Sequence, residues 1–108
     1  MSLLNSVLIR DVEPGMYYTN ILSYKECKPA NRQPYILVEM LVDGLYITDR
    51  WYANRIPYIM HCLRKQFHKQ YLDCTLSELL EYARTHRLLI GVSYDSRYGQ
   101  QIDYDNID

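Results

Sequence analysis

The sequence predicts a single mainly β domain with helices, covering residues 1–108, in which five antiparallel strands form a small barrel and a two-helix segment separates strands three and four. Three observations predict this class. Two strand-like runs flank a turn signal within 35–52, the apolar period changes from two to about three and a half after Tyr52, and strand composition returns at Arg87. The alternative, an open α+β antiparallel sheet with both helices on one face, uses the same elements.

The first predicted strand comes before the central hairpin. Residues 1–13 contain a short apolar run and are expected to form an N-terminal arm or short strand that packs on the domain. Pro14-Gly15 predicts a turn, and the run 16–27, rich in Tyr, Thr and Ile, predicts a long strand. A strand of this length can bend and pair on both sides, which favours the barrel over the open sheet. The polar loop 28–34 then leads into the hairpin.

The hairpin is predicted from Asp43-Gly44, because Asp-Gly between runs of β-branched and aromatic residues is the strongest local signal for a type I′ turn. Strand side chains alternate between two faces. The second strand therefore places on one face Leu45, Ile47, Asp49 and Trp51, and on the other Tyr46, Thr48, Arg50 and Tyr52. Trp51 is expected in the core. A face with an arginine between tyrosines suits the stacking of planar rings and contact with phosphate, although a solvated strand face explains the same residues.

Two helices follow. Apolar residues at helical spacing predict a helix over 54–71 with Pro57 in its first turn. Its opposite face is basic, and is interpreted either as a solvated face or as an auxiliary phosphate track: His61, Arg64, Lys65, His68 and Lys69. A capping box predicts a second helix over 75–86. Its expected buried stripe consists of Leu76, Leu79, Leu80 and Ala83. Strand 87–94, turn 95–99 and a short strand 100–104 complete the prediction.

Composition limits the functional classes. The formal net charge is −1, so any attraction to nucleic acid must be local rather than global. Twelve tyrosines against one phenylalanine and one tryptophan favour an interface of some kind. Three cysteines without a C-x-x-C pair fit neither a disulfide framework nor a zinc ribbon, so a reducing cytoplasm is expected. We expect neither export nor a membrane-spanning segment.

Enzymatic motifs are lacking in the sequence. There is no glycine-rich phosphate loop, nucleophile elbow or H-E-x-x-H motif, and no residue is nominated as a nucleophile. His61 and His68 would lie about 10 Å apart along a helix at roughly 1.5 Å per residue, too far to share one metal. We therefore predict no enzyme activity, no cofactor and no metal site.

The order of three strands, a helical segment and two strands is that of the OB-fold, a partly open five-stranded barrel. In this fold the ligand lies across strands two and three and between the loops that here are 28–34 and 95–99. These segments hold cations and rings that the fold would bring together. The predicted nucleic-acid-binding residues are Lys28, Arg32, Tyr46, Arg50, Tyr52, Arg97 and Tyr98.

Over residues 14–104 the sequence resembles small OB-fold single-stranded-DNA-binding proteins of bacteriophages and mobile elements. The likeness is carried by Pro14-Gly15-x-Tyr17, the hairpin around Asp43-Gly44 and the turn 94–99. It implies sequence-tolerant binding of single-stranded DNA during replication or recombination, and self-association into a homo-oligomer. Two features depart from the family. The helical segment is longer than the usual single helix, and the acidic ending 103–108 lacks a long tail with a terminal Pro-Phe.

A second hypothesis assigns the tyrosine-rich surface to another protein. Tyr, Trp and Arg are the usual anchors of protein interfaces, so the chain is alternatively a protein-interaction or assembly module. Salt separates the two hypotheses, because phosphate binding weakens steeply with ionic strength and an apolar interface does not. The sequence alone does not distinguish DNA from RNA.

Overall fold

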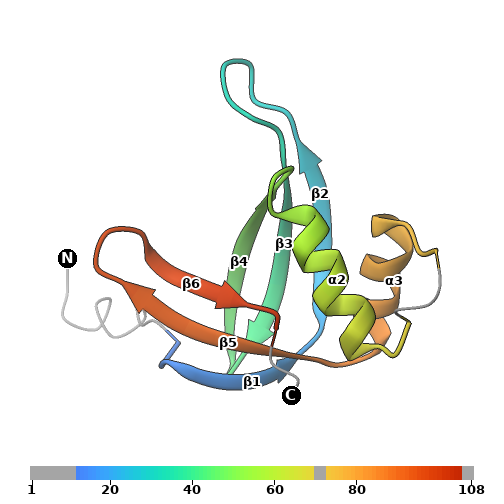
Figure 1. Ribbon diagram of the computed structural model, residues 1–108. Coiled ribbons are helices and arrows are strands. Elements are labelled where there is room, and N and C mark those ends of the chain that lie inside the picture. The colour runs from blue at the N-terminus through green and yellow to red at the C-terminus, as the bar shows by residue number, and fades with distance from the viewer. Residues whose placement is uncertain (1–11, 70–72, 106–108) are drawn as a thin grey trace.

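The computed structural model describes residues 12–69 and 73–105. These form a mainly β α+β fold of two open three-stranded antiparallel sheets with two helices between β4 and β5 (Figure 1). The elements are β1 (Gly15–Thr19), β2 (Ile21–Cys27), β3 (Tyr35–Val42), β4 (Leu45–Tyr52), α2 (Ile56–Gln66), α3 (Leu76–Thr85), β5 (Leu88–Asp95) and β6 (Gly99–Asp103). One sheet has the order β1-β5-β6 and the other β2-β3-β4. Most of the predicted arm 1–13 lies outside the described residues, although Val12 is buried.

The long first strand predicted over 16–27 is two strands separated at Asn20. β1 pairs with β5 and β2 pairs with β3, so the chain passes from one sheet to the other at this residue. The Asn20 amide donates to the carbonyls of Ala83 and Arg84 at the end of α3, at 3.3 and 3.5 Å. The buried Thr19 hydroxyl donates to the Leu41 carbonyl at 2.8 Å. These distant partners hold the bend in place.

The predicted closed barrel is not formed. In the described part of the chain no backbone ladder joins β4 to β6, and the two sheets stay open. The open antiparallel α+β alternative is closer to the observed fold, except that the strands divide into two sheets.

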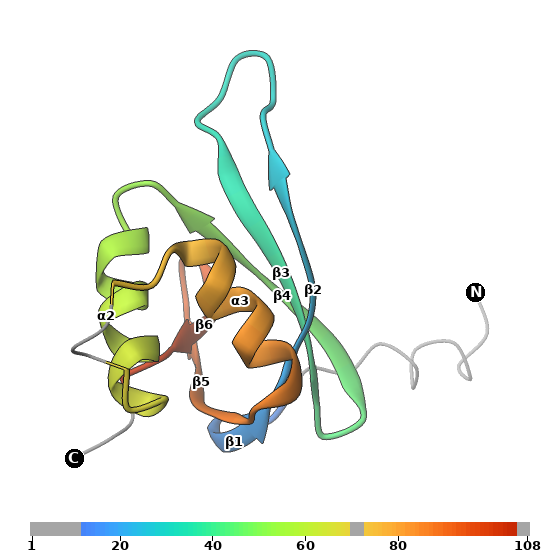
Figure 2. The same ribbon diagram turned by 90° about the vertical axis from the view of Figure 1, so that its right-hand side faces the viewer.

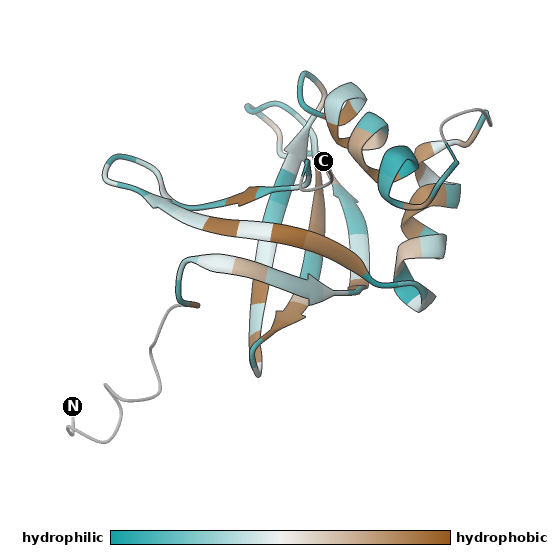
Figure 3. Ribbon diagram, turned by 60° about the horizontal axis from the view of Figure 1, so that its bottom comes forward, coloured by the Kyte–Doolittle hydropathy of each residue, from teal (hydrophilic) through white to brown (hydrophobic). Residues whose placement is uncertain are grey.

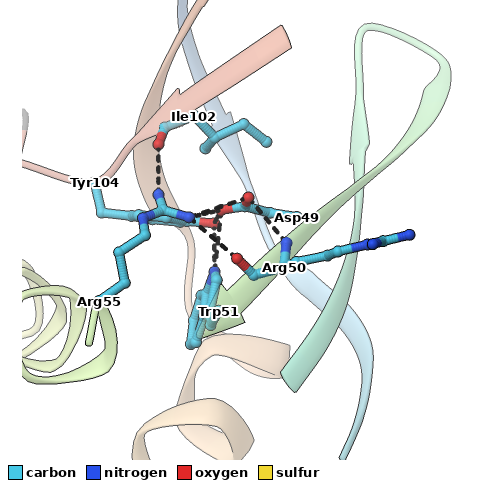
Figure 4. Close-up of polar contacts among 6 residues, drawn as sticks. All are labelled: Asp49, Arg50, Trp51, Arg55, Ile102 and Tyr104. Carbon is cyan, nitrogen blue, oxygen red and sulfur yellow. Dashed lines mark hydrogen bonds and ion pairs between the residues drawn. The ribbon is translucent and has the colours of Figure 1, made fainter. Parts of the chain in front are cut away.

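Polar side chains, rather than backbone hydrogen bonds, connect β4 to β6. Arg55 contacts the Asp49 carboxylate of β4 at 3.2 Å and donates to the Ile102 carbonyl of β6 at 3.0 Å (Figure 4).

Asp49 is the centre of this inter-sheet network. Its carboxylate also accepts from the Trp51 indole at 3.1 Å and from the Tyr104 hydroxyl at 2.7 Å. Burial, followed by the charge of Asp49, raises the pKa of Tyr104 well above its ordinary value, so the phenol stays protonated and donates. The network holds Trp51 inward and thereby fixes which side of β4 faces solvent.

The central hairpin agrees with the prediction. Asp43 and Gly44 have φ angles of 52° and 78°, as a type I′ turn requires at both central residues. The two-residue turn pairs Leu41 with Tyr46 and continues in register to Tyr35 opposite Tyr52. Trp51 is fully buried, which confirms the predicted assignment of the two faces.

The first helix is shorter than the predicted 54–71. α2 closes in a Schellman motif, in which the Lys69 amide donates to the Arg64 carbonyl at 2.7 Å and the His68 amide to the Lys65 carbonyl at 3.3 Å. His68 takes the left-handed conformation with φ of 57°, a position usually filled by glycine. Composition therefore gave no signal for this ending.

The second helix begins at the predicted capping box, formed in both directions between Thr75 and Glu78. Leu79, Leu80 and Ala83 are buried as expected, whereas Leu76 is only partly buried. The final strands lie within one residue of their predicted ends. In the turn between them the Asp95 carboxylate accepts from the amides of Arg97 and Tyr98, at 2.7 and 3.0 Å.

α3 packs against β2 on the inner side of the β2-β3-β4 sheet, and α2 packs against α3 and β5 (Figure 2). The core between them contains Ile21, Val38, Met40, Trp51, Ile59, Leu63, Leu79, Leu88 and Ile90. β5 is hydrophobic over its first residues, where it leaves the helical segment (Figure 3). Neither described helix is long and apolar enough to cross a membrane. This packing leaves the other side of the β2-β3-β4 sheet without helical cover.

Candidate nucleic-acid interface

The uncovered side of the β2-β3-β4 sheet, here called the outer face, carries the alternate residues of three strands. They are Ser23, Lys25 and Cys27 of β2, Tyr35, Leu37, Glu39 and Leu41 of β3, and Tyr46, Thr48, Arg50 and Tyr52 of β4. Each of them is exposed or partly exposed. The antiparallel register places these residues side by side across the three strands, so the strand pairing determines which of them are neighbours.

Three residues of the outer face form what we call the ring cluster: Tyr35, Arg50 and Tyr52. The rings of Tyr35 and Tyr52 pair directly across the two strands, with centroids 5.4 Å apart and planes tilted by 53°. The Arg50 guanidinium lies over the Tyr35 ring, 5.0 Å from its centroid. A hydrogen bond with Tyr52 raises the pKa of Arg50, so the guanidinium stays charged. The cluster therefore presents a fixed cation beside two π surfaces to solvent.

Tyr35 was not among the predicted site residues. The signal that would have found it is the turn itself, because a two-residue hairpin turn fixes every cross-strand pair. Counting outward from Asp43-Gly44 places Tyr35 opposite Tyr52 and Leu37 opposite Arg50, as observed. The position of Tyr35 beside Tyr52 thus follows from the amino-acid sequence of the hairpin.

Lys28 and Arg32 lie in the loop 28–34, which extends beyond the sheet at the top of Figure 1. This loop joins Cys27 to Tyr35, so both cations belong to the same end of the sheet as the ring cluster. Both are exposed. Lys28 forms an exposed ion pair with Glu26 at 3.3 Å. Such pairs contribute only about 0 to 1 kcal/mol, so a phosphate could replace the carboxylate at little cost.

Tyr46 belongs to the opposite end of β4. It lies six residues from Tyr52, or about 20 Å at roughly 3.3 Å per residue. Tyr46 is 70% exposed and pairs with Leu41, which is 41% exposed. It is on the predicted face but apart from the ring cluster.

Arg97 and Tyr98 lie on the turn between β5 and β6, in the other sheet. The Arg97 guanidinium is 5.9 Å from the Tyr98 ring centroid, and Tyr98 is 72% exposed. Figure 1 shows this turn at the left, away from the loop 28–34 at the top. Within the single molecule the structure therefore does not gather all seven predicted residues into one site.

A hollow of about 270 Å³ lies beside the ring cluster on the outer face. It is lined by Ser23, Tyr24, Lys25, Leu37, Glu39 and Thr48. Leu37 pairs with Lys25 on one side and with Arg50 on the other. Over the described residues, the side chains of Lys25 and Glu39 make no hydrogen bond or ion pair. Sequence reasoning did not identify this hollow.

The basic face of α2 is engaged within the molecule. Arg64 donates to the Cys74 carbonyl at 2.7 Å, Lys65 pairs with Asp105 at 3.0 Å, and the Lys69 ammonium lies 4.6 Å from the Tyr82 ring centroid. The contacts of Arg64 and Lys69 hold these two cations within the molecule, whereas the exposed Lys65–Asp105 pair contributes only about 0 to 1 kcal/mol. They favour a structural role for this face over a second binding surface.

In the described part of the chain, no group of three or more His, Cys, Asp and Glu side chains is placed to hold a metal ion. Cys27, Cys62 and Cys74 are free thiols.

Comparison of the chain with protein-family models, curated proteins and solved structures finds no match. Function is therefore inferred from the outer face itself.

Proposed function

We propose that the chain binds single-stranded nucleic acid, in the first place DNA, across the outer face of the β2-β3-β4 sheet and with little dependence on sequence. The observation that carries this proposal is the ring cluster, in which Arg50 lies over Tyr35 beside Tyr52. Stacking a base on an aromatic side chain is worth about 1 to 3 kcal/mol and tolerates every base, because each base has a π face. A guanidinium beside exposed aromatic rings suits contact with the bases and phosphates of a single strand better than it suits an apolar core.

The electrostatic contribution comes from a few local cations. Lys28 and Arg32 extend the cluster along the loop 28–34, and Arg50 supplies a third positive charge. With a formal net charge of −1, the chain has no general attraction for polyanions. Three phosphate contacts at about 0.7 each predict a slope near −2 in a plot of log affinity against log salt concentration. Tyr46, Arg97 and Tyr98 are proposed as outlying contacts for a longer strand.

The fold supports this assignment through its bent first strand. β1 and β2 are separated by Asn20 alone and pair with different sheets, as one strand does in an OB barrel that is partly open. In that fold the ligand lies across strands two and three and their flanking loops, and the corresponding strands here are β3 and β4. A role in phage or mobile-element replication or recombination, inside a reducing cytoplasm and as a homo-oligomer, completes the proposal. The three free thiols agree with that compartment.

The test is fluorescence anisotropy with labelled oligo-dT at about 50 and 200 mM salt. We expect saturable binding that weakens as salt rises, and a loss of affinity in Tyr52→Ala. Tyr58→Ala is the matched control, since Tyr58 is 51% exposed on α2 and away from the outer face. Absence of binding at the lower salt concentration, or equal losses in the two variants, would overturn the proposal.

A second candidate function has its own observation. Leu41 and Tyr46 form an exposed cross-strand pair at the hairpin end. An apolar row of this kind fits contact with another protein. In that case self-association or partner binding would persist at high salt and would be lost in Tyr46→Ser.

A further inference from the structure

The hollow beside the ring cluster contains two unpaired opposite charges over an apolar floor. Lys25 pairs in register with Leu37, and Glu39 follows Leu37 by two residues on β3. Diagonal neighbours of this kind lie about 7 to 8 Å apart, and no ion pair joins Lys25 to Glu39 in the described chain. A carboxylate on a surface that attracts phosphate opposes binding unless it contacts a hydrogen-bond donor of the ligand.

The size of the hollow suits one base. Its volume of about 270 Å³ is near the lower end of the roughly 300 to 1,000 Å³ that small-molecule sites occupy. Leu37 supplies an apolar surface for a planar ring, and Arg50 lies directly across from it on β4. The hydroxyls of Ser23 and Thr48 stand on either side of Glu39 in the register. Polar groups thus converge around one apolar surface.

We infer that this hollow is a nucleobase subsite that prefers guanine, an inference that rests on the proposed binding of single strands. A carboxylate accepts two parallel N–H bonds best, and single-stranded bases are read on their Watson–Crick edges. Guanine alone presents two adjacent donors there, N1–H and the N2 amino group, followed by the O6 acceptor. Glu39 accepts from the two donors, and Lys25 donates to O6.

The other bases match Glu39 less well, because each of them would bring a hydrogen-bond acceptor against its carboxylate. Adenine and cytosine place an acceptor nitrogen beside their amino group, and it would face the second carboxylate oxygen of Glu39. Thymine has one N–H between two carbonyls, so the second carboxylate oxygen of Glu39 would face a carbonyl oxygen. Binding along the strand therefore stays tolerant of sequence, because the ring cluster accepts any base, while one position discriminates.

The experiment measures the affinity of an oligo-dT of about 12 nucleotides, within the site size of one OB fold, against the same strand with a single central substitution. Substitution by guanine is expected to tighten binding about tenfold, the effect of one good bidentate contact. Hypoxanthine, which lacks the N2 amino group, should lose most of that gain. 7-Deazaguanine keeps the whole Watson–Crick edge and should retain it.

Glu39→Gln should remove the preference for guanine while leaving oligo-dT binding and the thermal melt intact. Glu13→Gln is the matched control, because it removes one exposed carboxylate just before β1, in the other sheet and away from the outer face. Equal affinity for all substituted strands, or a uniform gain in Glu39→Gln, would overturn the guanine subsite and leave the proposed function standing. Failure to bind any oligonucleotide would overturn both.

Discussion

Trp51 of β4 meets Tyr104, which follows β6, edge to face, with ring centroids 5.3 Å apart and planes at 83°. The indole N–H donates to the Tyr104 hydroxyl at 2.9 Å, and both residues are almost completely buried. This pair joins the two sheets where no backbone ladder does in the described chain. Trp51 points into the core, and its neighbour Tyr52 points to the outer face.

The first prediction uses these opposite directions. Trp51→Ala should lower the free energy of unfolding by about 3 to 5 kcal/mol, because it removes a large buried ring and leaves the Tyr104 and Asp49 groups short of a partner. Urea denaturation measures this loss. Protein that remains folded should bind oligo-dT normally, whereas Tyr52→Ala should melt normally and bind weakly. The reverse pattern would show that the two faces are assigned backwards.

The second prediction concerns the end of α2. His68 is exposed and holds φ of 57°, a conformation that costs most residues about 1 to 2 kcal/mol and glycine almost nothing. His68→Gly should raise the free energy of unfolding by about 0.5 to 1 kcal/mol, after the greater entropy of the unfolded glycine chain is subtracted. The matched control is His61→Gly, which lies exposed within α2 and should destabilise by about 1 kcal/mol. Destabilisation in both variants would contradict the Schellman ending.

These elements show why local structure could be predicted and the bends could not. The hairpin and α3 are determined by short motifs, Asp43-Gly44 and the Thr75 capping box, whose partners lie within a few residues. At Asn20 the chain passes from one sheet to the other, and the Asn20 side chain bonds to the carbonyls of Ala83 and Arg84, 63 and 64 residues away. No local sequence pattern indicates this break in the strand. The ending of α2 was missed because a histidine occupies the position where glycine would be the usual signal.

The barrel prediction failed for a related reason. Asp49 and Arg55 bridge β4 and β6 where no backbone ladder does in the described chain, and both look like ordinary strand and helix-start residues in the sequence. Their partner Tyr104 is 55 residues from Asp49. Alternation placed Arg50 and Tyr52 on the outer face, as observed, but the hollow around Glu39 depends on the pairing of three strands. The sequence could indicate the face but not its cavity.

The third prediction is a pH dependence. Hydrogen bonds from the Thr75 amide and hydroxyl hold the pKa of Glu78 below its ordinary value of 4.5. A depressed carboxyl pKa in the folded state adds stability that is complete above the unfolded value and is lost as the pH falls through the folded one. The difference in unfolding free energy between the native chain and Glu78→Gln should therefore be largest above about pH 5 and shrink toward pH 3. A constant difference would show that the charge of Glu78 has no part in the cap.

The last prediction separates the two kinds of contact in the ring cluster. Tyr52→Ala removes a stacking surface, so its loss of affinity, about 1 to 3 kcal/mol, should be the same at every salt concentration. Arg50→Ala removes a charge that lies over Tyr35, so it should also make the log–log salt slope shallower by about 0.7, one phosphate contact. Anisotropy titrations with oligo-dT at four salt concentrations measure both quantities.

The matched control is Arg84→Ala, which removes an exposed cation at the end of α3 and should change neither the affinity nor the salt slope. Arg55→Ala cannot serve as the control, because Arg55 joins β4 to β6. Identical slopes in the native chain and Arg50→Ala would remove phosphate from the role of Arg50 and leave it as a support for the Tyr35 ring.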